Sequence, residues 1–329
     1  MSRLEVLAPG GIGEVDARTD LVRLIADALD LADGDIVVVT SKIVSKAEGL
    51  LRRGDRQDAV DEETDRVVAR RGATRIVRTR HGLTLAAAGV DASNVPAGRH
   101  LVLPRDPDAS ARRLRAGLQE ATGRTVAVLI TDTAGRAWRE GQVDIAIGAA
   151  GLTVMEEYAG RRDGYGNELA VTRPAVADEL ASAAELAEGK LGGRPVARVR
   201  GRADLVLPAG EDGPGAAALV RPEGADMFGL GAREAVVRAL TGRPEDRAVF
   251  GAPASEEDLL LALRAVVGDH SLRVADSTAE QLTVEVPADH LPGLAAICFA
   301  HGWEPVPEQP QSSSSRPSSP SSVTIRRTS

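Results

Sequence analysis

The chain has 329 residues, a net charge of −8 and 43% hydrophobic residues, but only 2% aromatic residues. The length favours two domains, or one domain with an appendage, and the charge argues against a nucleic-acid-binding coat or an anionic membrane surface as partner. A single cysteine, Cys298, excludes an internal disulfide, and no apolar run reaches the roughly 20 residues of a membrane span. The N-terminus lacks the apolar stretch of a signal peptide. We therefore expect a cytoplasmic α/β-type protein.

The first 243 residues alternate short apolar runs with amphipathic segments. In chain order we expect a strand at 4–8, a helix at 20–31 capped by Asp16 or Thr19, and a buried strand at 35–40. Further strands are predicted at 74–79, 125–130, 144–148 and 196–199, and further helices at 109–121, 176–188 and 232–240.

The character of the chain changes after Pro244. We predict a helix at 255–267 with a Ser-x-x-Asp start, strands at 272–275 and 281–286, and a helix at 292–300. These elements form a small α+β appendage over 244–304. Pro and Ser dominate residues 305–329, which predicts a disordered tail.

Lysine is rare, with three residues against 37 arginines. Lys42 and Lys46 lie four residues apart, directly after the strand at 35–40, and Lys190 lies in a Gly-rich segment. A Lys ammonium binds phosphate as a point charge, whereas Arg presents a planar fork. The lysines therefore favour phosphate contacts, although chance placement is the simpler alternative. The Lys190 segment is not a P-loop, since Leu191 follows where Ser or Thr is required.

Two polar segments carry candidate metal ligands. Asp132 and Thr133 follow the predicted strand at 125–130, and a carboxylate beside a hydroxyl suits Mg²⁺. The alternative is a polar loop in which Asp132 caps a turn. Asp91 lies in Gly-Val-Asp-Ala-Ser-Asn-Val, where it either supplies a second carboxylate or forms an Asx turn, and the spacing leaves both interpretations open.

Taken together, these segments resemble the family of coenzyme F420-0:L-glutamate ligases, also called F420 gamma-glutamyl ligases. The resemblance lies in residues 11–15, 40–49, 89–95, 131–136, 141–148, 163–169 and 198–201. The segments occur in order and span roughly residues 4–243, predicted as the ligase domain.

The resemblance implies a mixed α/β (α+β) ligase fold and a homodimer with its site near the subunit interface. It also implies a reaction in which the γ-phosphoryl group of GTP activates the terminal carboxylate of coenzyme F420-0 as an acyl phosphate. The amine of L-glutamate then displaces phosphate, and later rounds add further gamma-linked glutamates. Two alternatives remain: a GTP-binding regulatory protein, and a ligase for a different carboxylate acceptor.

The same resemblance implies roles for individual residues. GTP contacts are expected at Ile12, Gly13, Glu14, Val15, Ser41, Lys42, Lys46, Asn94, and along the loop of Glu188, Gly189, Lys190, Leu191, Gly192, Gly193, Arg194 and Pro195. Asp91 and Asp132 are expected to hold one Mg²⁺ or Mn²⁺ ion and Thr133 a second, with K⁺ as a further expected ion. Arg136, Asp144 and Asp163 are candidates for binding the acceptor and glutamate, the first two as catalytic residues with Asp91 and Asp132.

Two departures from the family pattern stand out. Some members carry Gln, a ligand of the second ion, where this chain has Lys190, and an ammonium cannot ligate a metal. Some relatives are fused to a flavin-binding nitroreductase-like domain that is far larger than the appendage predicted here. We therefore expect no flavin chemistry, and a dimer-supporting or packing role is the simplest one for the appendage.

Overall fold

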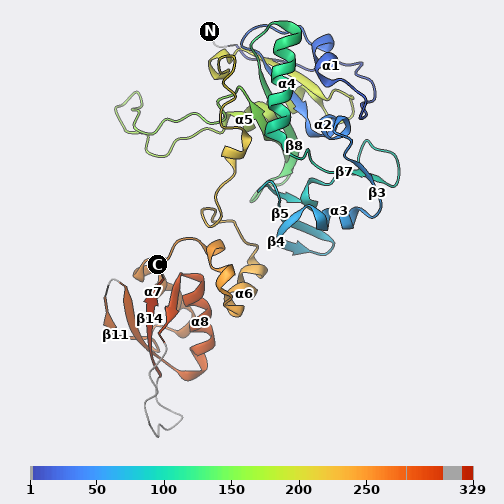
Figure 1. The fold of residues 1–329 in the computed structure, drawn as a ribbon. Coiled ribbons are helices and arrows are strands. Elements are labelled where there is room, and N and C mark those ends of the chain that lie inside the picture. The colour runs from blue at the N-terminus through green and yellow to red at the C-terminus, as the bar shows by residue number, and fades with distance from the viewer. Residues whose placement is uncertain (1–2, 279, 307–320, 329) are drawn as a thin grey trace. The chain divides into compact units, whose positions relative to one another are not determined.

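The computed structural model describes residues 3–278, 280–306 and 321–328, and these form two compact units (Figure 1). The first unit comprises 1–67 and 72–220, and the second comprises 68–71 and 221–329. The sequence predicted a boundary at 243. The division falls after Val220 instead, because helix α6 (Ala232–Thr241) packs against α8 (Leu291–Ala300) of the second unit. Helix and sheet are mixed in both units, as predicted.

A five-stranded sheet forms the centre of the first unit. Its strand order is β1 (Glu5–Leu7), β10 (Val196–Arg200), β2 (Ile36–Thr40), β8 (Ala127–Gly135) and β9 (Gln142–Ala150). Only β2 and β8 run parallel to each other. Their carboxyl ends therefore lie side by side, which places the residues that follow β2 next to the second half of β8.

Helices cover both faces of this sheet. Val37 and Val39 pack in one core with α1 (Leu21–Ala28) and α4 (Pro107–Thr122), whereas Ile36 and Val38 pack in the other with α5 (Val176–Glu188). Successive strand residues point to opposite faces, so a strand covered on both sides needs a continuous apolar run. This is the physical reason that β2 could be predicted.

A smaller lobe of the first unit carries the Asp91 segment. It contains β3 (Leu51–Arg53) paired with β7 (Arg99–Leu101), helix α3 (Arg56–Glu62), and the strands β5 (Thr74–Thr79) and β6 (Thr84–Ala86). Strand β4 (Thr64–Arg71) belongs to the same sheet as β5 and β6, and its last four residues are those that the division assigns to the second unit. Val60, Val77 and Val90 belong to its separate core. Of these elements, the sequence predicted only β5, since β3, β6 and β7 have three residues each, and β4 and α3 are rich in charged residues.

The second unit contains α6, α7 (Glu256–Val267), α8 and a four-stranded antiparallel sheet. Its strand order is β11 (Arg273–Ser277), β12 (Gln281–Val286), β14 (Ser321–Arg327) and β13 (Trp303–Pro305). The predicted cap of α7 is confirmed, since Ser255 accepts a hydrogen bond from the Asp258 amide at 3.2 Å.

The prediction of a disordered tail is wrong for Ser321–Arg327, and residues 307–320 of that tail lie outside the described residues. These last residues form β14, an inner strand of the sheet between β12 and β13. Ile325 is completely buried, and Val323 packs against the same core. The apolar alternation of Val323 and Ile325 was the available signal, but the surrounding Ser and Pro residues obscured it.

Two local predictions in the first unit also need correction, and one element was not predicted. Residues 41–47, where the sequence indicated no element, form helix α2 (Ser41–Ala47). Asp132 and Thr133 lie within β8 rather than beyond its end. Asp20 caps α1, accepting a hydrogen bond from the Arg23 amide at 3.1 Å. Strand β8 extends past the apolar run that revealed it because its second half pairs with β9. Within the described part of the chain, no helix is long and apolar enough to cross a membrane.

Candidate functional site

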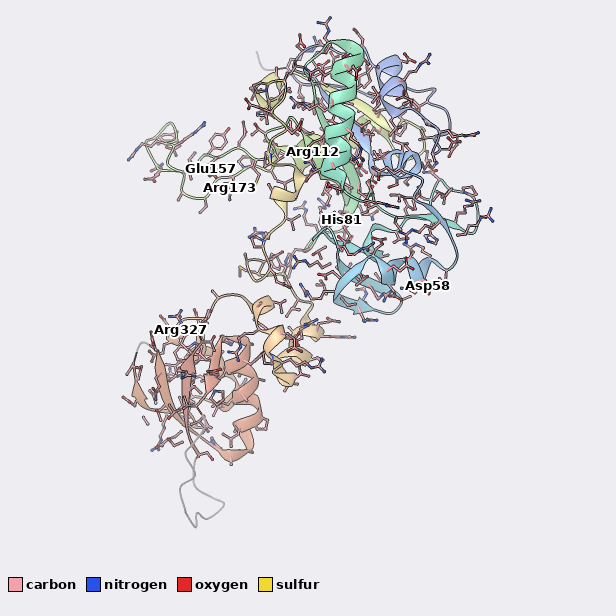
Figure 2. The ribbon with its side chains drawn as sticks, in the orientation of Figure 1. Asp58, His81, Arg112, Glu157, Arg173 and Arg327 are labelled. Carbon is pink, nitrogen blue, oxygen red and sulfur yellow. The ribbon has the colours of Figure 1, made fainter. Side chains whose placement is uncertain are left out.

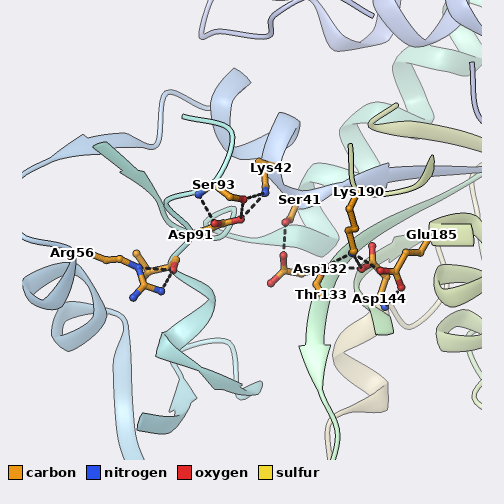
Figure 3. Close-up of polar contacts among 11 residues, drawn as sticks. Ser41, Lys42, Arg56, Asp91, Ser93, Asp132, Thr133, Asp144, Glu185 and Lys190 are labelled. Carbon is orange, nitrogen blue, oxygen red and sulfur yellow. Dashed lines mark hydrogen bonds and ion pairs between the residues drawn. The ribbon is translucent and has the colours of Figure 1, made fainter. Parts of the chain in front are cut away.

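The candidate site begins at the first turn of α2, which directly follows β2. The Ser41 hydroxyl donates a 3.0 Å hydrogen bond to Asp132 Oδ1 on the neighbouring strand β8. Lys42 Nζ lies 2.5 Å from Asp91 Oδ2 and donates a 2.8 Å hydrogen bond to Ser93 Oγ (Figure 3). The start of α2 thus connects the two acids that the sequence singled out, one on the main sheet and one on the small lobe.

Asp91 is fixed from both sides. Its backbone pairs with Leu101 at the end of β7, and Arg56 donates to the preceding Val90 carbonyl at 3.1 and 2.5 Å (Figure 3). The Ser93 amide donates to Asp91 Oδ1 at 2.6 Å, so the Asx turn is formed. The turn and the contact with Lys42 coexist, so the first does not exclude a ligand role for Asp91.

The pKa values of the two aspartates, Asp91 and Asp132, are shifted in opposite directions. Burial acts to raise the pKa of Asp91, but the hydrogen bond from Lys42 and the Ser93 amide outweigh it, so its pKa lies below the ordinary value. Asp132 is half-buried, and desolvation, opposed by the Ser41 hydrogen bond and reinforced by the charges of Asp144 and Asp91, raises its pKa to about 7. Its hydrogen-bond partner, Ser41, carries no positive charge to offset this.

The opposite face of β8 carries a second polar cluster. The hydroxyls of Thr131 and Thr133 donate to Asp144 on β9, at 3.2 and 2.7 Å. Lys190 Nζ donates to Thr133 Oγ1 at 2.9 Å and to Asp144 Oδ1 at 3.3 Å, and it also pairs with Glu185 of α5 (Figure 3). Residues 131 and 133 share this face because strand side chains alternate, which leaves Asp132 on the α2 face.

The loop from Glu188 to Pro195 returns to the start of α2. Its last carbonyl, on Pro195, accepts a 3.0 Å hydrogen bond from the Thr40 amide. Glu188 is only 3% exposed, and its Oε1 has no hydrogen-bond partner in the structure. Burial and the charge of Asp144, only partly offset by Lys190, raise the pKa of Glu188 to about 8. The side chains of this loop do not all point inward: Glu188 is buried, whereas Leu191 is fully exposed.

The segment from Ile12 to Val15 approaches α2 from the other side. Lys46 is buried on α2, and its ammonium pairs with Glu14. Val15 is buried in the main core, and Ile12 packs against it. Glycines at 11 and 13 leave open space beside this segment, since a Cβ at either would meet no atom. The segment therefore combines an anchored backbone with an open surface.

The structure does not bring every predicted site residue into these clusters. Arg136 lies in the exposed β8–β9 turn and donates to the Glu140 carbonyl at 2.7 Å. Asp163 organises a separate surface turn, accepting from the Tyr165 amide at 2.8 Å. This turn belongs to a long loop, and an ion pair of 2.7 Å between Arg173 and Glu157 joins the two ends of that loop (Figure 2). Asn94 follows Ser93 in a left-handed conformation with φ of 52°.

Three residues of the clusters were not among the predicted site residues. Glu185 lies three residues before Glu188, so both occupy the same side of α5, and this spacing was a usable signal. Thr131 lies two residues before Thr133, which places both on one strand face. Ser93 lies two residues after Asp91, which is the spacing of the Asx turn that the sequence left open, whereas its contact with Lys42, 51 residues away, had no local signal.

The donor set of the α2 face fits a divalent cation. Asp91 and Asp132 supply hard carboxylate oxygens, and the pKa of Asp132 is raised partly by the charge of Asp91. A bound cation would relieve this repulsion. No group of three or more His, Cys, Asp or Glu side chains capable of holding a metal occurs among the described residues. Mg²⁺ accommodates such a sparse set, since it keeps several waters and takes phosphate oxygens.

Comparison with known proteins decides the family. Residues 11–59 and 54–201 match the family described as F420-0:Gamma-glutamyl ligase. The chain belongs to this family. The match includes α2, the Asp91 segment, β8 and the 188–195 loop, and it ends at residue 201, before the 221–329 part of the second unit.

Individual relatives agree with this result. The coenzyme F420:L-glutamate ligase of Methanothermobacter thermautotrophicus is 41% identical over 255 residues, covering 68% of this chain and 98% of that protein. The enzyme of the same name from Methanopyrus kandleri is 42% identical over 233 residues, covering 64% and 91%. That of Archaeoglobus fulgidus is 39% identical over 220 residues, covering 60% and 88%. Family members carry these names as ligases, so the chain is an enzyme of the ligase class.

Proposed function

We propose that the protein ligates L-glutamate to coenzyme F420-0 at the expense of GTP, and extends the product through further gamma-linked glutamates. The terminal carboxylate of the acceptor attacks the γ-phosphorus of GTP, forming an acyl phosphate and releasing GDP. The amine nitrogen of glutamate then attacks the acyl carbon, forming the amide and releasing phosphate and a proton. The observation that carries the proposal is the convergence of Lys42, Asp91 and Asp132 at the start of α2, in a member of this ligase family.

The lysines of α2 suit the nucleotide phosphates. Lys42 and Lys46 lie four residues apart and therefore on one side of the helix, with Ser41 at its first position. Both ammonium groups are held by carboxylates that an entering phosphate can replace: Lys42 by Asp91 and Lys46 by Glu14. Such positioned positive charges lower the barrier by neutralising charge that develops on the transferred phosphoryl group.

Asp91 and Asp132 would hold a divalent ion, Mg²⁺ or Mn²⁺. When bound, this ion screens the repulsion between the anionic donor and the anionic acceptor. Ser41 keeps the Asp132 carboxylate oriented through its hydroxyl, and the Ser93 amide does the same for Asp91 once Lys42 turns to the phosphate. The remaining residues position substrate: Asp144 is held rigid by Thr131 and Thr133, and we propose that it orients the loop that faces the nucleotide.

A direct assay tests the reaction. The protein is incubated with GTP, L-glutamate and coenzyme F420-0, with Mg²⁺ or Mn²⁺, in the presence and absence of K⁺, and products are separated by mass spectrometry. We expect one or more added glutamyl units, with GDP and phosphate formed in equal amounts. GTP binding without glutamyl addition under any of these conditions would favour a regulatory protein. Addition to another carboxylate in preference to F420-0 would reassign the acceptor.

We further propose that the protein acts as a homodimer. Light scattering coupled to size-exclusion chromatography measures the mass in solution. A mass of twice the chain is the expected result, and a monomer that retains full glutamyl transfer would overturn this proposal.

A further inference from the structure

The ammonium group of Lys190 has the surroundings of a bound cation. It contacts three oxygens: Thr133 Oγ1 at 2.9 Å, Asp144 Oδ1 at 3.3 Å, and a carboxylate oxygen of Glu185 (Figure 3). A Lys ammonium has three N–H donors and no acceptor, so these three oxygens satisfy it completely. A planar Arg fork matches a carboxylate bidentately but fits less well into such a compact oxygen pocket.

The hydroxyl of Thr133 is held in place by the ammonium. Thr133 Oγ1 donates its proton to Asp144 Oδ1 at 2.7 Å and accepts a hydrogen bond from Lys190 at 2.9 Å. A metal ion at this hydroxyl would have to displace the ammonium, because two positive charges on the same small group of oxygens repel each other strongly. The pocket that the sequence assigned to a second metal ion is therefore the pocket that the Lys190 ammonium fills.

The backbone delivers Lys190 to this place. Helix α5 ends at Glu188, and Gly189, with φ of +63°, adopts a conformation that a side-chain-bearing residue would find strained. The chain thereby reverses, and the next side chain turns back toward β8 and β9. Around it gather the acids Asp144, Glu185 and Glu188, of which the first and last are almost fully buried.

We propose that Lys190 is a built-in cation that takes the place of a second metal ion, so that this protein uses one divalent ion, held by Asp91 and Asp132. The ammonium neutralises the negative charge of Asp144 and Glu185. It also supplies a fixed positive charge near the start of α2, where we propose that the phosphates bind. The position of the first ion rests on the proposed function, whereas the occupancy of the second pocket by an ammonium rests on the contacts alone. Removing the ammonium opens a cation site, because the Lys190 side chain is 58% exposed and solvent ions can reach the pocket.

Counting bound Mn²⁺ tests the proposal without relying on turnover. Free Mn²⁺ is measured by electron paramagnetic resonance during titration of the full chain, with an equimolar non-hydrolysable GTP analogue. We expect one Mn²⁺ per chain for the wild type and two for Lys190→Gln, whose amide oxygen can join Thr133 and Asp144. Lys190→Arg keeps the charge and should stay at one ion. Arg124→Gln, which breaks an exposed ion pair with Asp33, is the matched control and should also bind one.

The outcomes separate this proposal from a merely structural role and from the ligase reaction. If Lys190 only tethers the loop to α5, Lys190→Gln lowers the melting temperature but leaves the Mn²⁺ count at the wild-type value, and the proposal is wrong. Two ions in the wild type, or none, would also overturn it. A change from one ion to two supports it even where no glutamyl transfer is detected, and in that case the proposed function alone fails.

Discussion

Ser41 and Asp132 lie 91 residues apart in the chain, yet the Ser41 hydroxyl donates a 3.0 Å hydrogen bond to Asp132 Oδ1. This contact joins the first residue of α2 to the middle of β8, and it exists because β2 and β8 are parallel neighbours with aligned carboxyl ends. The hydrogen bond stabilises the charged form of a half-buried acid and limits the rise of its pKa, which reaches about 7. Ser41 therefore keeps Asp132 available to a cation.

Replacing Ser41 by Ala should weaken metal binding without removing a ligand. Loss of a hydrogen bond that orients a ligand typically costs about 10- to 100-fold in metal affinity. We expect Mn²⁺ affinity to fall by roughly 10-fold with the number of bound ions unchanged. Calorimetric titration measures both quantities, and Ser182→Ala, which removes a hydroxyl on α5 that donates to the Asp144 carbonyl, is the control. An unchanged affinity in Ser41→Ala would separate Ser41 from the ion.

Asp132→Asn should remove turnover and leave the fold intact. The amide keeps the side-chain volume and an oxygen for the Ser41 hydrogen bond, but it loses the charge that holds a divalent ion. We expect glutamyl transfer to fall by about 100-fold or more. Because the raised pKa of Asp132 makes its charged form unfavourable in the folded protein above pH 7, the uncharged variant should melt at or above the wild-type temperature at pH 8. Wild-type-like turnover would exclude Asp132 as an essential ligand.

Lys46→Arg tests whether α2 needs point charges. Lys46 is buried, and its ammonium already pairs with Glu14, so a larger planar guanidinium must reorganise the pocket. We expect KM for GTP to rise by roughly 10-fold with a smaller change in kcat. The control is Arg23→Lys on the exposed face of α1, which exchanges the same two residue types outside the candidate site. It should leave both constants unchanged. GTP kinetics indistinguishable from wild type would show that any cation suffices at position 46.

Glu188→Gln should change how stability depends on pH. Burial and the charge of Asp144 raise the pKa of Glu188 from 4.5 to about 8. The folded protein thus keeps a proton that the unfolded chain releases, and stability contributed by the neutral acid is complete below pH 4.5 and lost as pH rises through 8. The variant lacks this loss, so its advantage in free energy of unfolding should grow from pH 5 to pH 8, by up to roughly 4 kcal/mol, and then level off.

Urea denaturation of wild type and Glu188→Gln at pH 5, 6, 7, 8 and 9 measures this difference. A constant offset across the series would mean that Glu188 is charged in the folded protein throughout. Glu179→Gln, on the same helix but outside the cluster, provides the baseline for removing one carboxylate from α5.

Ile325→Ala should destabilise the second unit. Ile325 is completely buried in an inner strand, and removing its side chain leaves a cavity that typically costs about 2–5 kcal/mol. We expect protease sensitivity within 221–329 while glutamyl transfer by the first unit continues. Arg326→Ala, one residue away, loses only a surface ion pair with Glu304 and should cost less than about 1 kcal/mol. Equal stability of the two variants would contradict an inner position for β14.

The sequence by itself determined those features that depend on residues adjacent in the chain. The apolar run of Ile36–Thr40 revealed a strand covered on both faces, and Val176–Glu188 was predicted to its observed ends because its apolar stripe repeats with the period of a helix. Asp91, Asp132, Lys42 and Lys46 were singled out from local composition and family resemblance. Their mutual approach follows from a sheet whose parallel pair brings distant segments to one edge.

Only the tertiary structure decided the relationships between segments that do not interact locally. The family resemblance brought position 190 together with Thr133, but it did not indicate that the ammonium also reaches Asp144 and Glu185, because those contacts depend on the pairing of β8 with β9 and on the turn at Gly189. In the same way, Ser321–Arg327 becomes a strand only because β12 and β13 offer it hydrogen bonds on both edges. Local propensity fixes a segment when its own residues supply the stabilising contacts, and long-range packing decides wherever those contacts come from elsewhere in the chain.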